Sequence, residues 1–95
     1  MGEYNELKQL QNMELYTPEF IKCFCYLKGI TIKDFYKSFG FNFGYPYFTK
    51  VLNYKKPMND KFKIEVALCF NELYKISTDE IIKVAKLREL LSKNF

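Results

Sequence analysis

Apolar residues recur along the chain at intervals of three and four, the period of an α-helix that buries one face. Thr17 followed by Pro18 indicates a helix start, because threonine caps free N–H groups and proline fits the first turn. Gly29 is typical of the residue that ends a helix. Between these signals the expected inner face is formed by Phe20, Ile21, Phe24 and Leu27. The pattern therefore predicts a helix between Thr17 and Gly29.

Two shorter helices are expected next. Thr31 opens the first, and Asp34 stands where a carboxylate favours the positive end of the helix dipole. Its predicted inner face, which ends at Gly40, consists of Ile32, Phe35, Tyr36 and Phe39. After a turn over residues 41–46, a helix is predicted from Pro46 or Tyr47 to about Tyr54. Its predicted inner face is Phe48, Val51 and Leu52, and the run Lys55-Lys56-Pro57 ends it.

The rest of the chain also has a helical period. Asn59 or Asp60 caps a segment whose apolar positions are Phe62, Ile64, Ala67, Leu68 and Leu73. The run from Ser77 to Glu80 is a capping box, and it opens an amphipathic helix over residues 78–92. We expect residues 1–16 to be an acidic extension or a sixth helix, since residues 4–15 have only a thin apolar stripe. No stretch alternates with period two, so we expect an all-α domain of five to six helices spanning residues 1–95.

Composition narrows the class of protein. The chain is 48% hydrophobic, enough for a core, yet no run approaches the roughly 18 apolar residues of a membrane span. The polar start carries no secretory signal, so we expect a cytoplasmic protein with no membrane partner. The chain has no histidine and an odd number of cysteines, Cys23, Cys25 and Cys69, which we expect to be buried thiols.

Those absences also argue against catalysis. No histidine is present to activate Ser38, Ser77 or Ser92 as a nucleophile, and no glycine-rich phosphate loop or metal motif occurs. We therefore expect neither an enzyme, nor a cofactor, nor a metal site.

The positive charge is concentrated in the middle of the chain. Residues 21–63 carry nine lysines against Asp34 and Asp60, a balance of +7. Residues 1–20 carry one lysine against four glutamates, a balance of −3, and residues 64–95 carry five charges of each sign. A polyanion would be attracted to the middle third.

The middle third also resembles a known family. The run Gly29-Ile30-Thr31-Ile32-Lys33-Asp34-Phe35, then Phe39-Gly40-Phe41, then the stretch from Phe48 to Pro57 is similar to the Cro/C1-type (Xre-like) helix-turn-helix family. The resemblance covers about residues 20–85. It implies a lambda-repressor-like fold with a central helix-turn-helix, and a phage-repressor-type transcription regulator that binds double-stranded DNA.

The outer face of the second short helix supplies the expected base contacts. With Phe48, Val51 and Leu52 inward, the residues that point outward are Tyr47, Thr49, Lys50 and Asn53. Asparagine can bond adenine through two hydrogen bonds and lysine can contact guanine, so Lys50 and Asn53 are the candidates for base edges. The candidates for phosphate contacts, at helix ends and in loops, are Lys33, Lys37, Lys55 and Lys56.

Three features depart from the family pattern. Tyr36 stands where a small residue usually lets the two helices touch, the turn with Gly44 and Pro46 is about two residues longer, and Tyr54 replaces a glycine. The longer turn either makes room for Tyr36 or removes the second helix from a groove. The turn also carries Phe43, Tyr45 and Tyr47, which suit stacking on single-stranded bases or a protein interface.

Two functions from different classes follow. The first is a DNA-binding regulator, expected to be a homodimer through Ile82, Leu87, Leu90 and Leu91 on the last helix. The second is an interaction module on the same scaffold, such as a phage-encoded, anti-CRISPR-like inhibitor of a host defence protein or ribonucleoprotein. Tyr36, the long turn with Phe43 and Tyr45, and the position of the sole arginine, Arg88, favour the second.

Overall fold

The computed structural model describes residues 15–93, and it is all-α. Within that range it contains five α-helices, one π-helical segment and no strand. The α-helices are α2 (Pro18–Lys28), α3 (Ile32–Lys37), α4 (Tyr45–Leu52), α5 (Asp60–Leu68) and α6 (Thr78–Lys93). The helical segment expected over residues 4–15 lies outside the described residues, apart from Leu15.

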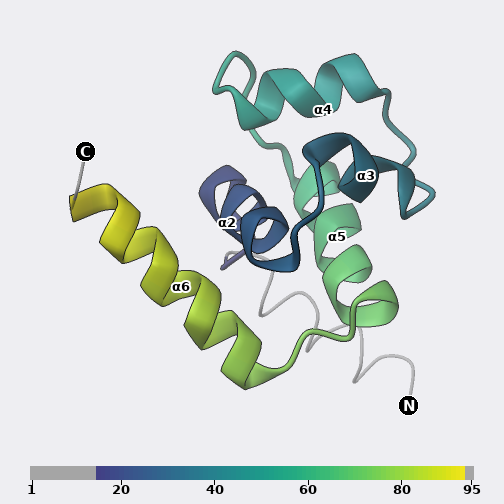
Figure 1. Cartoon of the computed structure of the whole chain (residues 1–95). Helices are drawn as coiled ribbons and strands as arrows, with labels where there is room; N and C mark the ends of the chain where they lie inside the picture. The colour runs from purple at the N-terminus through teal and green to yellow at the C-terminus, as the bar shows by residue number, and fades with distance from the viewer. Residues whose placement is uncertain (1–14, 94–95) are drawn as a thin grey trace.

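Helix α2 is the centre of the arrangement. It packs against α3, α4 and α6, and Figure 1 shows α6 running beside it while α3 and α4 lie at its other side. Thr17 caps it by accepting a hydrogen bond of 3.2 Å from the N–H of Phe20, and Gly29 ends it at φ 68°. Both end signals read from the sequence are thus confirmed.

Helix α3 begins with the expected threonine. Thr31 accepts from the N–H of Asp34 at 3.0 Å, and the Asp34 carboxylate accepts from the N–H of Thr31 at 3.3 Å. This reciprocal pair satisfies two of the N–H groups that a helix start leaves free. The helix ends at Lys37, two residues earlier than Phe39, the last inner-face position predicted for it.

The segment predicted to have a helical period up to Leu73 is helical, but its helix type changes along the way. Helix α5 ends at Leu68, and residues Cys69–Leu73 form a wider π-helical turn called η2. Cys69 and Phe70 in this turn are fully buried, and Val66 and Ala67 before it are buried too. Leu73 is 45% exposed.

Aromatic rings fill the core around η2. The ring of Phe70 lies 4.6 Å from Tyr16, 4.8 Å from Phe24 and 5.4 Å from Phe35, measured between centroids. These separations are those of favourable stacked and edge-to-face pairs. One buried side chain therefore joins the segment before α2, α2 itself and α3.

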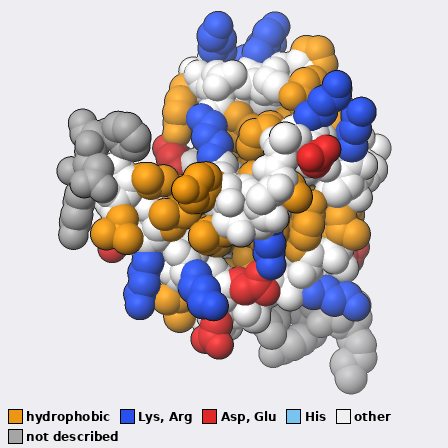
Figure 2. Space-filling view, viewed as in Figure 1, with side chains coloured by type: hydrophobic (Ala, Val, Ile, Leu, Met, Phe, Trp, Pro, Cys, Tyr) orange, Lys and Arg blue, Asp and Glu red, His pale blue; other side chains and the backbone are white. Residues whose placement is uncertain are grey.

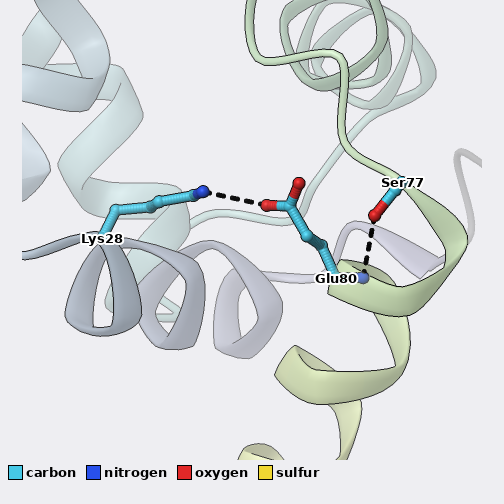
Figure 3. A network of polar contacts seen from close by, with 3 residues as sticks. All are labelled: Lys28, Ser77 and Glu80. Carbon is cyan, nitrogen blue, oxygen red and sulfur yellow. Dashed lines mark hydrogen bonds and ion pairs between the residues drawn. The ribbon is translucent and has the colours of Figure 1, made fainter.

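The start of α6 is joined to the end of α2 (Figure 3). Ser77 accepts a hydrogen bond of 3.2 Å from the N–H of Glu80, as the predicted capping box requires. The Glu80 carboxylate also pairs with the ammonium of Lys28 at 2.9 Å. Because this pair is partly exposed, it orients the two helix ends more than it stabilises them. None of the described helices is long and apolar enough to cross a membrane.

Candidate nucleic-acid interface

Two short helices and the turn between them form the part of the fold to which the sequence assigns binding. Helices α3 and α4 contact each other, and both contact α2. The turn between them, residues 38–44, is held from both sides. The hydroxyl of Tyr36 donates to the carbonyl of Phe43 at 2.6 Å, and the N–H of Asn42 donates to the Glu65 carboxylate at 2.7 Å.

Tyr36 packs among the aromatic rings of the turn and of α4. The Tyr36 ring lies 5.7 Å from Phe41, 5.3 Å from Tyr45 and 5.5 Å from Phe48. The rings of Tyr36 and its three neighbours thus pack together between α3, the turn and α4. Compensation between the longer turn and Tyr36 stays a prediction.

The acidic side chain that anchors the turn comes from α5. Glu65 is 7% exposed, and only one of its carboxylate oxygens is hydrogen-bonded within the described residues. A buried carboxylate with a single hydrogen bond is costly, so its position depends on that bond to Asn42. Nothing in the sequence around Glu65 indicates this role, because its partner lies 23 positions away in the chain.

The outer face of α4 carries few polar groups. Phe48, Val51 and Leu52 are buried, as the helical period predicted. Lys50 and Asn53 are exposed, and neither side chain takes part in a hydrogen bond or ion pair within residues 15–93. The remaining outward polar group is the hydroxyl of Thr49, which donates to the carbonyl of Pro46 at 2.9 Å.

Tyr47 lies apart from this face, toward α5. Its hydroxyl accepts from the amide of Asn59 at 3.0 Å, and its ring lies 6.0 Å from that of Phe62. The ammonium of Lys56 lies 6.0 Å from the centre of the same ring. Tyr47 is thus half-buried between α4 and the start of α5, where its hydroxyl is hydrogen-bonded.

The loop after α4 brings the two neighbouring lysines back onto the helix end. The carbonyl of Lys50 accepts from the N–H of Lys55 at 2.8 Å and from that of Lys56 at 3.3 Å. Tyr54, the residue just before Lys55, adopts φ 61°, and its N–H donates to the carbonyl of Val51 at 3.1 Å. This is a Schellman ending, which normally has glycine at the left-handed position. A tyrosine there costs about 1–2 kcal/mol.

The Tyr54 side chain reaches across to the start of α2. Its hydroxyl donates to the Glu19 carboxylate, and the ammonium of Lys22 lies 5.1 Å from the ring centre. Burial raises the pKa of Tyr54 to about 12, and the bond to Glu19 adds to the shift. The phenol therefore remains protonated, and a hydrogen-bond donor, across the physiological range.

Lys22 is a basic residue of this region that the sequence analysis missed. It lines an open pocket of about 210 Å³ together with Thr49 and Asn53. Nothing in the residues around Lys22 indicates this neighbourhood, because Asn53 lies 31 positions further along the chain. Only the packing of α2 against α4 brings the two together.

The lysines proposed for phosphates are all exposed. Lys33 and Lys37 lie on α3, and Lys55 and Lys56 lie in the loop after α4. Figure 2 shows basic side chains along the upper edge of the molecule, where α3 and α4 lie in Figure 1. This edge therefore presents mainly positive charge to solvent.

The aromatic residues of the turn pack against rings of the neighbouring helices. The Phe43 ring lies 4.8 Å from Phe62, and Tyr45, the first residue of α4, lies 5.3 Å from Tyr36. Both Phe43 and Tyr45 are half-buried. Little of either ring is left for stacking on a base or on another protein.

The apolar residues of α6 divide between two sides of the helix. Leu87 packs against the core, whereas Leu91 is 39%, Ile82 46% and Leu90 58% exposed. Further exposed apolar area belongs to α2, where Tyr26 is 76% and Leu27 49% exposed. Figure 2 shows hydrophobic side chains gathered where α6 runs beside α2.

The three thiols are buried, as expected. Burial raises the pKa of Cys25 and of Cys69 to about 12, so neither is a thiolate near neutral pH. Within residues 15–93 no group of three or more acidic or sulfur side chains is placed to hold a metal ion.

Comparisons with protein-family models, with curated proteins and with solved structures gave no match to this chain.

Proposed function

We propose that this protein binds double-stranded DNA, with α3 and α4 acting as a helix-turn-helix and α4 entering the major groove. The observation that carries the proposal is the outer face of α4, where Lys50 and Asn53 are exposed and unengaged within the described residues. Lysine and asparagine match the hydrogen-bonding edges of guanine and adenine. We further propose that the protein is a small transcription regulator of the phage-repressor kind.

The surroundings of α4 support it. Lys55 and Lys56 are fixed by their N–H groups to the carbonyl of Lys50, directly beside the proposed base contacts. Lys33 and Lys37 are exposed on the preceding helix, so the proposed phosphate contacts come from the segments before and after α4. Phosphate contacts on both sides of a helix set its register in the groove.

Titration against duplex DNA at several salt concentrations tests the proposal. Each of Lys55→Ala and Lys56→Ala should weaken binding to all sequences and reduce the salt slope by about one. Lys50→Ala and Asn53→Ala should instead cost about 1–3 kcal/mol on the preferred sequence and relax the preference. Lys86→Ala is the matched control, because it removes the same charge from an exposed position of α6.

Failure of the wild-type protein to bind duplex DNA at roughly 50 mM salt would overturn the proposal, since phosphate contacts are strongest there. Tighter binding to RNA or to a single strand than to the duplex would also overturn it.

A second candidate function is favoured by one observation. Tyr26 and Leu27, neighbours on α2, are 76% and 49% exposed. Tyrosine is enriched in the energetically dominant positions of protein interfaces. The candidate is an inhibitor of the anti-CRISPR kind, which would bind a host defence protein or ribonucleoprotein. In that case Tyr26→Ser should abolish binding to the partner, leave the Tm unchanged and have no effect on any DNA complex.

A further inference from the structure

The left-handed residue that ends α4 is a tyrosine, although the fold uses glycine for the same purpose elsewhere. Gly29 ends α2 at φ 68°, and Tyr54 follows α4 at φ 61°. Glycine adopts this conformation without a steric penalty, whereas a side chain with a Cβ does not. A tyrosine at this position therefore indicates that its side chain makes a contribution that offsets the steric cost.

The side chain provides a connection between α4 and α2. The Tyr54 hydroxyl donates to the carboxylate of Glu19, which lies 35 positions earlier in the chain. The Lys22 ammonium, one turn further along α2, covers the ring at 5.1 Å. The ring remains 62% exposed, so its contribution to the hydrophobic core is small. These contacts hold the loop more than they fill the interior.

We propose that Tyr54 is a positioning residue of the DNA-binding face: it holds the loop 53–56 against α2, so that Lys55 and Lys56 meet the phosphates in one fixed arrangement. The inference rests on the proposed function. Both lysine N–H groups already converge on the carbonyl of Lys50. A loop that is ordered before binding loses less conformational freedom when the DNA arrives.

The variant Tyr54→Gly separates positioning from structural support. It relieves the backbone strain but removes the connection to Glu19 and Lys22. The Tm should therefore stay within about 3 °C of the wild-type value. Hydrogen exchange at the Lys55 and Lys56 amides should become at least about tenfold faster. Affinity for duplex DNA should fall by about tenfold because the loop must be ordered on binding.

Two variants serve as controls. Tyr54→Phe keeps the ring beside Lys22 and loses only the bond to Glu19, so its effects should lie between those of the wild type and Tyr54→Gly. Lys75→Gly makes the same backbone change at φ 48°, at an exposed residue after η2. It should leave exchange at the Lys55 and Lys56 amides unchanged.

The outcomes separate the inference from the function on which it rests. If Tyr54→Gly binds duplex DNA as tightly as the wild type, the inference fails and the DNA-binding proposal stands. If the wild type binds no DNA at low salt, both fail. If Tyr54→Gly unfolds, Tyr54→Phe decides: unchanged amide exchange and affinity in that variant overturn the inference.

Discussion

The hydroxyl of Tyr36 donates a hydrogen bond of 2.6 Å to the backbone carbonyl of Phe43, across the turn that connects α3 to α4. The ring beneath that hydroxyl contacts Phe41, Tyr45 and Phe48. One side chain therefore sets both the spacing of the two helices and the path of the turn. The position of α4, and of whatever its outer face binds, depends on this contact.

Substitution of Tyr36 should reveal the two contributions separately. Tyr36→Phe loses only the hydrogen bond and should lower the free energy of unfolding by about 1 kcal/mol. Tyr36→Ala also loses the ring contacts and should lower it by about 3 kcal/mol. Urea denaturation measures both. Tyr26→Phe is the control, since Tyr26 is 76% exposed and should show no change. Equal stability of Tyr36→Phe and the wild type would show that the hydrogen bond is not needed.

The second anchor of the turn, Glu65, should respond differently to two substitutions. Glu65→Ala leaves the N–H of Asn42 without its acceptor and should cost about 1–3 kcal/mol. Glu65→Gln keeps an oxygen that can accept this bond and removes a buried charge, so most of the stability should remain. Urea denaturation at neutral pH distinguishes the two. Equal destabilisation by both variants would show that the charge, and not the hydrogen bond, matters.

The ion pair between α2 and α6 predicts a weak dependence of stability on pH. The hydrogen bond from Lys28 lowers the pKa of Glu80 below its ordinary value of 4.5. A lowered pKa in the folded state means that the pair stabilises the fold above pH 4.5. This contribution is lost as the pH falls through the folded value.

Unfolding measured in urea from about pH 6 to pH 3 tests this, with Glu80→Gln as the comparison. In the variant, the free energy of unfolding should fall less as the pH is lowered, because the contribution of Glu80 is missing. Because the pair is exposed, about 1 M salt should reduce the difference between the two proteins. If the free energy of unfolding falls equally with pH in Glu80→Gln and in the wild type, this ion pair is not a source of the pH dependence.

Local signals in the sequence predicted the helix starts well. Thr17 and Thr31 cap helices because each needs only a residue three positions away, and such contacts are visible in a short stretch of sequence. The all-α class followed from the same short-range periodicity. Signals of this kind do not extend to contacts between helices.

What depends on distant partners was not predicted. The apolar period alone does not indicate the π-helical turn η2, in which Cys69 and Phe70 are both buried. Tyr47 lies toward α5 because Asn59 and Phe62 are there to receive it. Lys22 lies beside Asn53 only because α2 packs against α4. The helical period therefore predicted that Lys50 and Asn53 are exposed, but not which side chains the other helices place next to them.

The homodimer expected from the sequence would form through the exposed apolar residues of α6. Ile82 and Leu90 are 46% and 58% exposed. Eight residues along a helix separate them by about 12 Å along the axis and about 80° around it. A partner helix that crosses α6 obliquely can cover both positions. A second copy would also bring a second α4 to the DNA, as two successive half-sites require.

Leu90→Lys should therefore convert the dimer to a monomer without changing the Tm of the subunit, because the side chain is mostly exposed. Affinity for a two-site duplex should fall more than affinity for a single half-site, since only the first depends on linked binding. Light scattering at several protein concentrations measures the mass. Ile64→Lys is the control, because Ile64 is 39% exposed on α5, away from α6. If the wild type is a monomer at high concentration, α6 is no dimer surface, and each DNA-binding face would have to act alone.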